Sequence, residues 1–201
     1  MASPSRRGRN GRPAGRPSVL ESKEIALHVL FVCTGNICRS PTAERLAAGY
    51  GDQFQHTNWT ASSAGTHAVI SHPIHREAAL VLEELGGDPH DFAARQLTPR
   101  IAAGADLILT MTRAHRDDVL SLAPQRLNRT FTLSEAARLA SEFDAHDVVD
   151  LAALRSHVVA DDSLDIADPI GMSADVFRTI GRRIAELLPP VVQLCRNSQA
   201  C

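Results

Sequence analysis

One stretch, LHVLFVCTGNICRSPTAERL from Leu27 to Leu46, limits the folds open to this chain. Its first part, Leu27–Val32, is an unbroken apolar run rich in β-branched and aromatic residues, which is typical of a strand buried on both faces. The segment Ser40–Gly49 opens with Ser and Pro and continues in helix-forming residues, so it predicts a helix. A buried strand that leads through a short loop into a helix is typical of parallel α/β sheets.

The rest of the chain alternates in the same way. Further strands are expected at 59–64, 106–111 and 129–133. Helices are expected from Pro73 to Gly86-Gly87, over 113–122, from Ser134, over 148–158, and from Ser173 until Pro189-Pro190 interrupts the last one. This order predicts an α/β, flavodoxin-like three-layer fold, with a four-stranded parallel sheet and helices on both faces. Ligands of such sheets bind beyond the carboxyl ends of the strands, so the loop after Val32 should lie at the ligand site.

The loop after Val32 contains two cysteines, and its other residues favour a reactive thiol. Cys33 and Arg39 enclose five residues, Thr34, Gly35, Asn36, Ile37 and Cys38, at the start of a helix. We expect the N–H groups of this loop to turn inward and, with the helix N-terminus, to favour a thiolate at Cys33 and a bound phosphate. Gly35 lets the backbone approach a ligand closely, and Asn36 is a residue type that tolerates left-handed geometry.

Two further side chains complete the predicted chemistry. Arg39 offers a planar fork that matches two phosphoryl oxygens, and Ser40 can donate its hydroxyl hydrogen to the Cys33 sulfur. These groups suit in-line phosphoryl transfer to sulfur, followed by hydrolysis of the thiophosphate. The reaction needs a general acid, for which we select Asp168, because Asp168-Pro169 before Ile170-Gly171 predicts a rigid turn. Asp165 is the alternative acid.

The sequence C-T-G-N-I-C-R-S-P-T-A-E from Cys33 resembles the signature of the low-molecular-weight protein tyrosine phosphatases, in their bacterial form. The resemblance spans about 26–190. Further segments similar to the family are Ser63–Thr66, Ala94–Leu97, Asp106–Val119, and Asp168-Pro169 with the helix of Val176-Phe177. It implies Cys33 as nucleophile, Arg39 as phosphate clamp and Asp168 as acid, with Asn36, Ser40 and Ser63 supporting the loop. It requires no metal and no cofactor.

The role of Cys38 has two interpretations. In the first, its side chain packs in the interior and only its amide binds phosphate. In the second, which the resemblance implies, it forms a reversible disulfide with Cys33 that protects the nucleophile from over-oxidation.

The pocket rim departs from the family. Members that act on phosphotyrosine usually carry aromatic residues at the mouth, whereas this chain has Val69 and Ile170 there. Phosphoarginine phosphatases of this fold resemble the same loop with a threonine at the position of Ile37, so Ile37 favours aryl phosphates. Phe92 stands where animal members carry a loop-supporting histidine. Residues 134–160 are longer than the family needs and are a candidate to shape the rim.

Composition and charge set the wider expectations. The first 24 residues hold six basic and two acidic residues, which leaves 15 basic and 21 acidic residues, a formal charge of −6, for the rest. That sign gives no support for nucleic-acid binding. No apolar run is long enough for membrane insertion, the opening residues lack a secretory apolar region, and the cysteine positions favour a reducing, cytoplasmic setting. We expect a disordered Arg/Gly/Pro-rich extension at 1–24, a phosphatase domain at 25–192 and a tail at 193–201.

The predicted function is hydrolysis of phosphotyrosine or other aryl phosphate monoesters through a cysteinyl-phosphate intermediate. Its substrate would be a phosphorylated protein or a small aryl phosphate. Two alternatives stay open: a thiol-dependent arsenate reductase, which would need electrons from small thiols because no cysteine lies between Cys38 and Cys195, and a redox-sensing phosphate-binding module. The nine histidines show no spacing typical of metal ligands.

Overall fold

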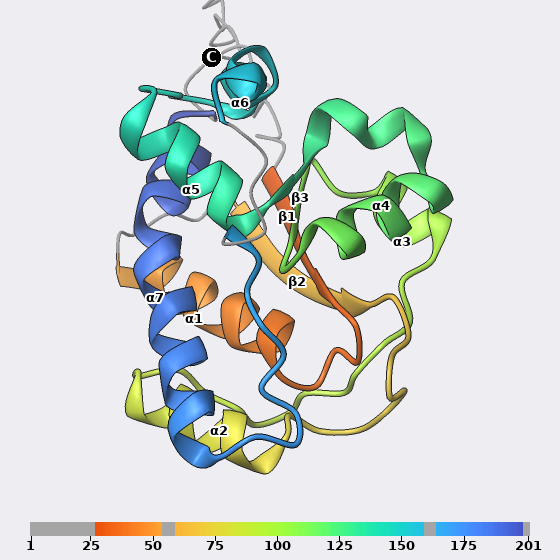
Figure 1. The fold of residues 1–201 in the computed structure, drawn as a ribbon, viewed down its shortest axis with the longest axis vertical. Coiled ribbons are helices and arrows are strands. Elements are labelled where there is room, and N and C mark those ends of the chain that lie inside the picture. Colours follow the sequence, from red (N-terminus) through yellow and green to blue (C-terminus); the bar gives the residue numbers. More distant parts are fainter. Residues whose placement is uncertain (1–26, 54–58, 159–163, 199–201) are drawn as a thin grey trace, which may run out of the picture.

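A central parallel sheet organises the computed structural model, which describes residues 27–53, 59–158 and 164–198 (Figure 1). Its strands are β1 (Leu27–Cys33), β2 (Trp59–Gly65), β3 (Leu107–Thr110) and β4 (Thr130–Thr132), in the order β2-β1-β3-β4, with every neighbouring pair parallel. This confirms the predicted sheet. The expected extension at 1–24 lies outside the described residues.

Helices cover both faces of the sheet. One face carries α1 (Arg39–Gln53), α5 (Leu133–Glu142) and α7 (Ala174–Asn197), and the other carries α3 (Pro99–Ala103) and α4 (Arg113–Leu122) (Figure 1). The alternation along β1 explains this, because Val29 and Phe31 belong to the core cluster on the α1 side while Leu30 and Val32 belong to the cluster on the α4 side. The three-layer flavodoxin-like fold is therefore confirmed.

Several element boundaries differ from the predicted ones. Helix α2 (Arg76–Glu84) begins three residues after Pro73, because the intervening backbone is bonded to the loop after β1: the His75 N–H donates to the Ile37 carbonyl at 2.7 Å. The helix predicted at 148–158 is divided into α6 (Val148–Leu154) and a 3₁₀ turn, η2 (Arg155–His157). Neither α3 nor the 3₁₀ helix η1 (Pro124–Arg129) was predicted.

The prediction that Pro189-Pro190 interrupts the last helix is wrong. Both prolines lie inside α7, which continues to Asn197. Two intrahelical hydrogen bonds are lost there, but the residues around the prolines are buried in the core and outweigh that loss: Leu187, Leu188, Val191 and Val192. The domain boundary predicted at 192 thus falls inside a helix. Cys195, assigned to the tail, is a buried core residue.

The described part of residues 134–160 lies away from the loop after β1. It forms most of α5, all of α6 and η2, at the end of the molecule opposite α2 (Figure 1). A capping box of Thr132 and Glu135 starts α5, and Glu135 also pairs with Arg155 at 3.5 Å and Arg116 at 3.6 Å. These contacts join the segment to the β4 edge of the sheet. No described helix combines the length and hydropathy of a membrane span.

Candidate active site

The loop between β1 and α1 is held in place by hydrogen bonds that its carbonyl groups accept from the neighbouring segment 66–75. The carbonyls of Cys33, Thr34, Gly35 and Ile37 accept hydrogen bonds of 2.7–3.0 Å from backbone N–H groups of Thr66, His67, Val69 and His75, respectively. Because the C=O and N–H of a peptide unit point in opposite directions, the N–H groups that follow these carbonyls are turned toward the interior of the loop. The loop therefore presents a ring of donors, as an anion site requires.

Asn36 fixes the shape of the loop. Its backbone is left-handed, with φ of 54°, and its side chain is fully buried. The Arg95 N–H donates to its Oδ1 at 2.8 Å, so the amide nitrogen Nδ2 faces the other way and donates to Ser40 Oγ at 3.0 Å and to Ser63 Oγ at 2.7 Å. Asn36 thus finds partners although Phe92 replaces the histidine of animal members. Phe92 packs under the Arg45 guanidinium instead, 5.8 Å from it.

The direction of each hydrogen in this network follows from Asn36. Ser40 Oγ accepts from Asn36, so its own hydrogen is free for the Cys33 sulfur, which lies 3.0 Å away. Ser63 Oγ likewise accepts from Asn36 and donates to the carboxylate of Glu44. Burial raises the pKa of Glu44, while the Ser63 hydrogen bond opposes that rise. A chain of bonds therefore runs from Glu44 to the sulfur, and it leaves the Ser40 hydroxyl hydrogen available to a thiolate at Cys33.

Glu44 and Arg95 are members of the site that sequence reasoning did not name. Both stand in segments quoted for the family resemblance, which is the signal that was available. Gln96 belongs with them, because its side chain accepts from the Ala68 N–H and donates to the Thr66 carbonyl, at 2.9 and 2.8 Å. These residues stabilise the segment that holds the loop carbonyls.

Position 65 requires glycine because the Thr34 carbonyl approaches its backbone closely. A Cβ at this position would lie 2.4 Å from the Thr34 carbonyl oxygen, a backbone atom that cannot move aside. The backbone of Gly65 also bonds to both neighbours of Gln96, accepting from Leu97 and donating to Arg95. The loop, β2 and the 94–97 segment therefore meet at a point with no room for a side chain.

Arg39 lies beneath the pocket with 3% of its surface exposed. One terminal nitrogen donates to the Ile166 carbonyl at 3.0 Å, and the other donates to Asp168 Oδ2 at 2.6 Å. Its Nε is buried and has no hydrogen-bond partner within the described residues. The guanidinium is therefore held at the pocket by the bonds of its two terminal nitrogens.

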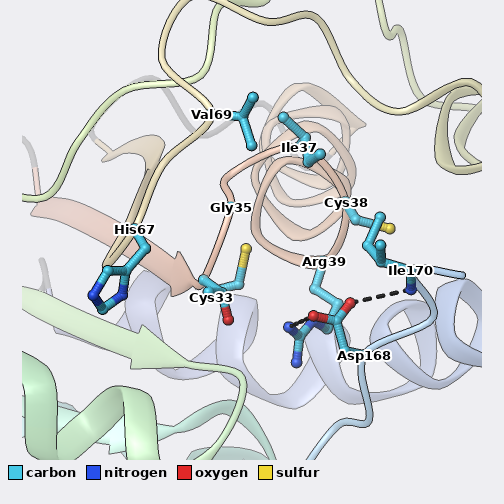
Figure 2. A pocket seen from close by; sticks show the side chains of 10 residues that line it. Cys33, Gly35, Ile37, Cys38, Arg39, His67, Val69, Asp168 and Ile170 are labelled. Atoms are coloured by element: carbon cyan, nitrogen blue, oxygen red, sulfur yellow. Dashed lines mark hydrogen bonds and ion pairs between the residues drawn. The ribbon is translucent and has the colours of Figure 1, made fainter.

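Asp168 reaches the same pocket from the loop before α7 (Figure 2). Its side chain is 45% exposed and its Oδ1 accepts from the Ile170 N–H at 3.3 Å. The predicted turn is present: the Met172 N–H donates to the Pro169 carbonyl, and Gly171 has φ of 81°. The alternative acid, Asp165, accepts from the Arg113 N–H at the start of α4 and does not line the pocket.

The pocket measures about 240 Å³ and opens over the loop (Figure 2). Its walls are formed by Cys33, Thr34, Gly35, Ile37, Cys38, Arg39, His67, Val69, Asp168 and Ile170. Nine of these ten were predicted site residues, and His67 is the addition. The other predicted members, Asn36, Ser40 and Ser63, lie behind the loop and support it. No described residue of 134–160 lines this pocket, so the expectation that this segment shapes the rim is wrong for its described part.

Two neighbouring groups are kept uncharged. Burial, reinforced by the negative charges of Cys33 and Asp168, raises the pKa of the Cys38 thiol to about 12. Burial, followed by the charge of Arg39, lowers the pKa of His115 to about 4. The neutral imidazole bridges Thr34 Oγ1 and Thr112 Oγ1, each at 2.8 Å. His115 therefore links the loop to the N-terminus of α4.

Comparison with known proteins agrees with this geometry. The family model described as low molecular weight phosphotyrosine protein phosphatase matches residues 28–150. The low molecular weight protein-tyrosine-phosphatase Etp of Escherichia coli (strain K12) is 36% identical over 107 residues, which are 53% of this chain and 69% of Etp.

Solved structures extend the likeness across the fold. The low molecular weight protein tyrosine phosphatase from T. tengcongensis superposes with a TM-score of 0.66 at 30% identity, covering 83% of this chain and 98% of that one. The YwlE arginine phosphatase from Geobacillus stearothermophilus gives a TM-score of 0.64 at 28% identity, covering 83% and 90%. With the family model matching more than half of its length, this chain belongs to the low molecular weight phosphotyrosine protein phosphatase family.

Proposed function

We propose that this protein is a phosphatase that hydrolyses phosphotyrosine or other aryl phosphate monoesters through a cysteinyl-phosphate intermediate. The observation that carries the proposal is one pocket that brings together the Cys33 sulfur, the loop with its inward N–H donors, buried Arg39 and Asp168. A phosphate dianion fits this arrangement, because its oxygens can accept from the loop and from Arg39 while phosphorus lies over sulfur.

In the first step the Cys33 thiolate attacks phosphorus, and the bond from phosphorus to the aryl oxygen breaks. Protonated Asp168 gives its proton to the departing oxygen, so a neutral phenol leaves. The bond between Asp168 and Arg39 would be exchanged for bonds from Arg39 to the phosphoryl group, which releases the carboxyl group for this task. The ring of N–H donors stabilises the charge on the equatorial oxygens.

In the second step water attacks the thiophosphate and the sulfur–phosphorus bond breaks. Asp168 accepts the proton of the attacking water, and inorganic phosphate leaves. The electrons of the broken bond return to sulfur, where the hydroxyl hydrogen of Ser40 stabilises the thiolate at 3.0 Å. The cycle consumes one water and needs no metal or redox cofactor.

Cys38 is our candidate for a redox partner. It lines the pocket as a buried thiol. A peroxide would oxidise Cys33 to a sulfenic acid, and the Cys38 sulfur would then attack the Cys33 sulfur to form a disulfide, while the Cys38 proton and the displaced hydroxide leave as water. The positions of the cysteines in the sequence favour a reducing compartment, and we propose a cytoplasmic protein that acts on phosphorylated proteins or small aryl phosphates. The domain with this activity runs from β1 through α7.

Hydrolysis of para-nitrophenyl phosphate under reducing conditions tests the proposal. We expect turnover by the parent and a loss on the order of 10⁴-fold or more in Cys33→Ser, because the alkoxide is not available as a nucleophile at neutral pH. Cys195→Ala is the matched control, since it removes a core thiol away from the pocket. An inert parent, or an active Cys33→Ser protein, would refute the mechanism.

A panel of substrates tests which chemical class of phosphate this protein hydrolyses best. Phosphotyrosine, phosphoarginine and a sugar phosphate should be compared at equal concentration, because similar structures include arginine phosphatases. We expect the highest kcat/KM for phosphotyrosine, since Ile37 and Val69 offer apolar surface to an aromatic ring. A higher value for phosphoarginine would replace the substrate class and leave the nucleophile unchanged.

A further inference from the structure

The pocket mouth is surrounded by exposed apolar side chains. Among the described residues eight large apolar side chains are exposed, and four of them stand on the two segments that border the pocket. These four, here called the apolar rim, are Val69 (39% exposed), Ile70 (63%), Ile170 (45%) and Met172 (62%). In Figure 2, Val69 and Ile170 lie on different sides of the pocket. A local concentration of exposed apolar surface marks an interaction site more often than isolated residues do.

Two similar turns carry the rim. The first closes through the His72 N–H to the Val69 carbonyl at 3.1 Å, with Ser71 at φ of 65°. The second closes through the Met172 N–H to the Pro169 carbonyl at 2.9 Å, with Gly171 at φ of 81°. A left-handed third residue is typical of type II turns, which place the second residue, here Ile70 or Ile170, at the tip.

Both turns are attached to the catalytic loop. Val69 N–H donates to the Gly35 carbonyl at 2.9 Å. Asp168, which accepts from the Ile170 N–H, also accepts from Arg39 at the end of the loop at 2.6 Å. The backbone of the rim is therefore held in place while its side chains stay exposed. Burying such side chains against a partner gains free energy without a large cost in backbone ordering.

The loop after β1, which forms the floor of the pocket, determines which partner reaches the apolar rim. A phosphoryl group bound at the loop brings its own substrate against the rim, and Ile70 and Met172 lie beyond the ten residues that line the pocket. They would contact groups next to the aromatic ring. Acidic groups are disfavoured there, because a carboxylate placed against these apolar side chains loses hydration and gains no hydrogen-bond donor from them.

We propose that the apolar rim selects phosphotyrosyl segments with apolar residues next to the phosphotyrosine, over segments with acidic residues there. The proposal rests on the proposed function and deepens it. Ile70 and Met172 form the outer contacts, and Val69 and Ile170 contact the ring. The partner is a polypeptide that carries its apolar side chains within a few residues of the phosphate.

The test uses two phosphotyrosyl peptides that differ only at the flanking positions, leucine and valine in one and glutamate in the other. We expect kcat/KM of the parent to be about tenfold higher for the apolar peptide, with para-nitrophenyl phosphate as the internal reference. Ile70→Ser combined with Met172→Gln should bring the peptide ratio close to one. The substitutions add no charge, so a changed ratio reports lost apolar contact.

A matched control is available on the far surface. Val149→Ser combined with Leu127→Gln changes side chains of similar exposure, 65% and 52%, on α6 and η1. The peptide ratio of this protein should equal that of the parent. Equal rates for the two peptides in the parent, or an undiminished ratio in the Ile70/Met172 variant, would overturn the proposal.

Failure of the proposed function would be seen separately. If para-nitrophenyl phosphate is not hydrolysed, the phosphatase assignment fails, and the rim is then tested by binding of both peptides to the Cys33→Ser protein in a calorimeter. Tighter binding of the apolar peptide, lost in the Ile70/Met172 background, would still support the rim. Equal affinities would refute it.

Discussion

The floor and the rim of the pocket are built by opposite rules, although both depend on left-handed backbone. In the floor, Asn36 is fully buried and every polar atom of its side chain is bonded. In the rim, Ser71 and Gly171 shape turns whose isoleucines stand in solvent. The contrast teaches that chemistry and choice of substrate are separable here. Substitutions in the floor should change rates for all substrates, and substitutions in the rim should change their ranking.

After Cys33→Ser, the most damaging change to the floor is Arg39→Lys. An ammonium cannot reproduce the planar fork or the Nε–H donor, so we expect kcat/KM for para-nitrophenyl phosphate to fall about 10³-fold. Arg138→Lys, at an exposed ion pair on α5, is the control and should match the parent. A loss below tenfold would mean that Arg39 does not contact the transferring group.

Asp168 joins the two regions, because it lies on the rim segment and serves the floor. We expect Asp168→Asn to lower kcat about 10²-fold with phenyl phosphate and less with para-nitrophenyl phosphate, whose leaving group needs less protonation. Asp165→Asn is the control: the amide oxygen can still accept from the Arg113 N–H, so this variant should retain the parent's stability and kcat. Equal losses on both substrates in Asp168→Asn would exclude a role as general acid.

Behind the floor, Ser63→Ala should have a moderate effect on both rate and stability. It removes an acceptor from Asn36 and leaves the Glu44 carboxylate without its donor, so we expect a loss of about 1–2 kcal/mol in the free energy of unfolding and about tenfold in kcat. Denaturant unfolding and steady-state kinetics measure the two. Ser121→Ala, an exposed helix hydroxyl on α4, controls for removal of a serine. An unchanged kcat would show that the network stabilises the fold without orienting Ser40.

The smallest effect concerns His115, which supports the floor through Thr34. Its pKa of about 4 lies below the ordinary value of 6.5, so as the pH falls between these values the unfolded chain binds a proton that the folded chain does not. The free energy of unfolding therefore decreases toward acid. We expect His115→Asn to reduce this decrease by about 1–2 kcal/mol between pH 6.5 and 4. Parallel pH profiles for the two proteins would contradict a neutral, buried imidazole.

The parts of the fold with strong local signals were predictable. The apolar run of β1, the Ser-Pro start of α1 and the Asp168-Pro169 turn each depend on a few adjacent residues, and the structure has them where they were expected. The continuation of α7 through two prolines was not, because it depends on burial against distant elements. The same holds for α3, a helix of five residues with too few positions to show a period.

The residues of the site also divide into those that local sequence predicts and those that depend on distant contacts. Most residues that line the pocket were predictable from the spacing within one loop and from one distant turn, whereas Val69 came from the family resemblance and His67 was missed. The support of Glu44 and Arg95 was hidden, because each acts through a single bond to a residue far along the chain, at separations of 19 and 59 positions. The equal geometry of the two rim turns was hidden too, since it becomes apparent only when both face one pocket.

The four outward-bonded carbonyls of the loop have a thermodynamic consequence. The ring of donors is assembled without its ligand, so binding of an oxyanion orders little of the chain and most of the interaction energy is retained as affinity. Inorganic phosphate, the product, should then bind the folded state alone and stabilise it by mass action, by about 2.7 kcal/mol at 100 times its dissociation constant. The melting temperature should rise with phosphate concentration. The thermal stability of this protein would then depend on the concentration of its own product.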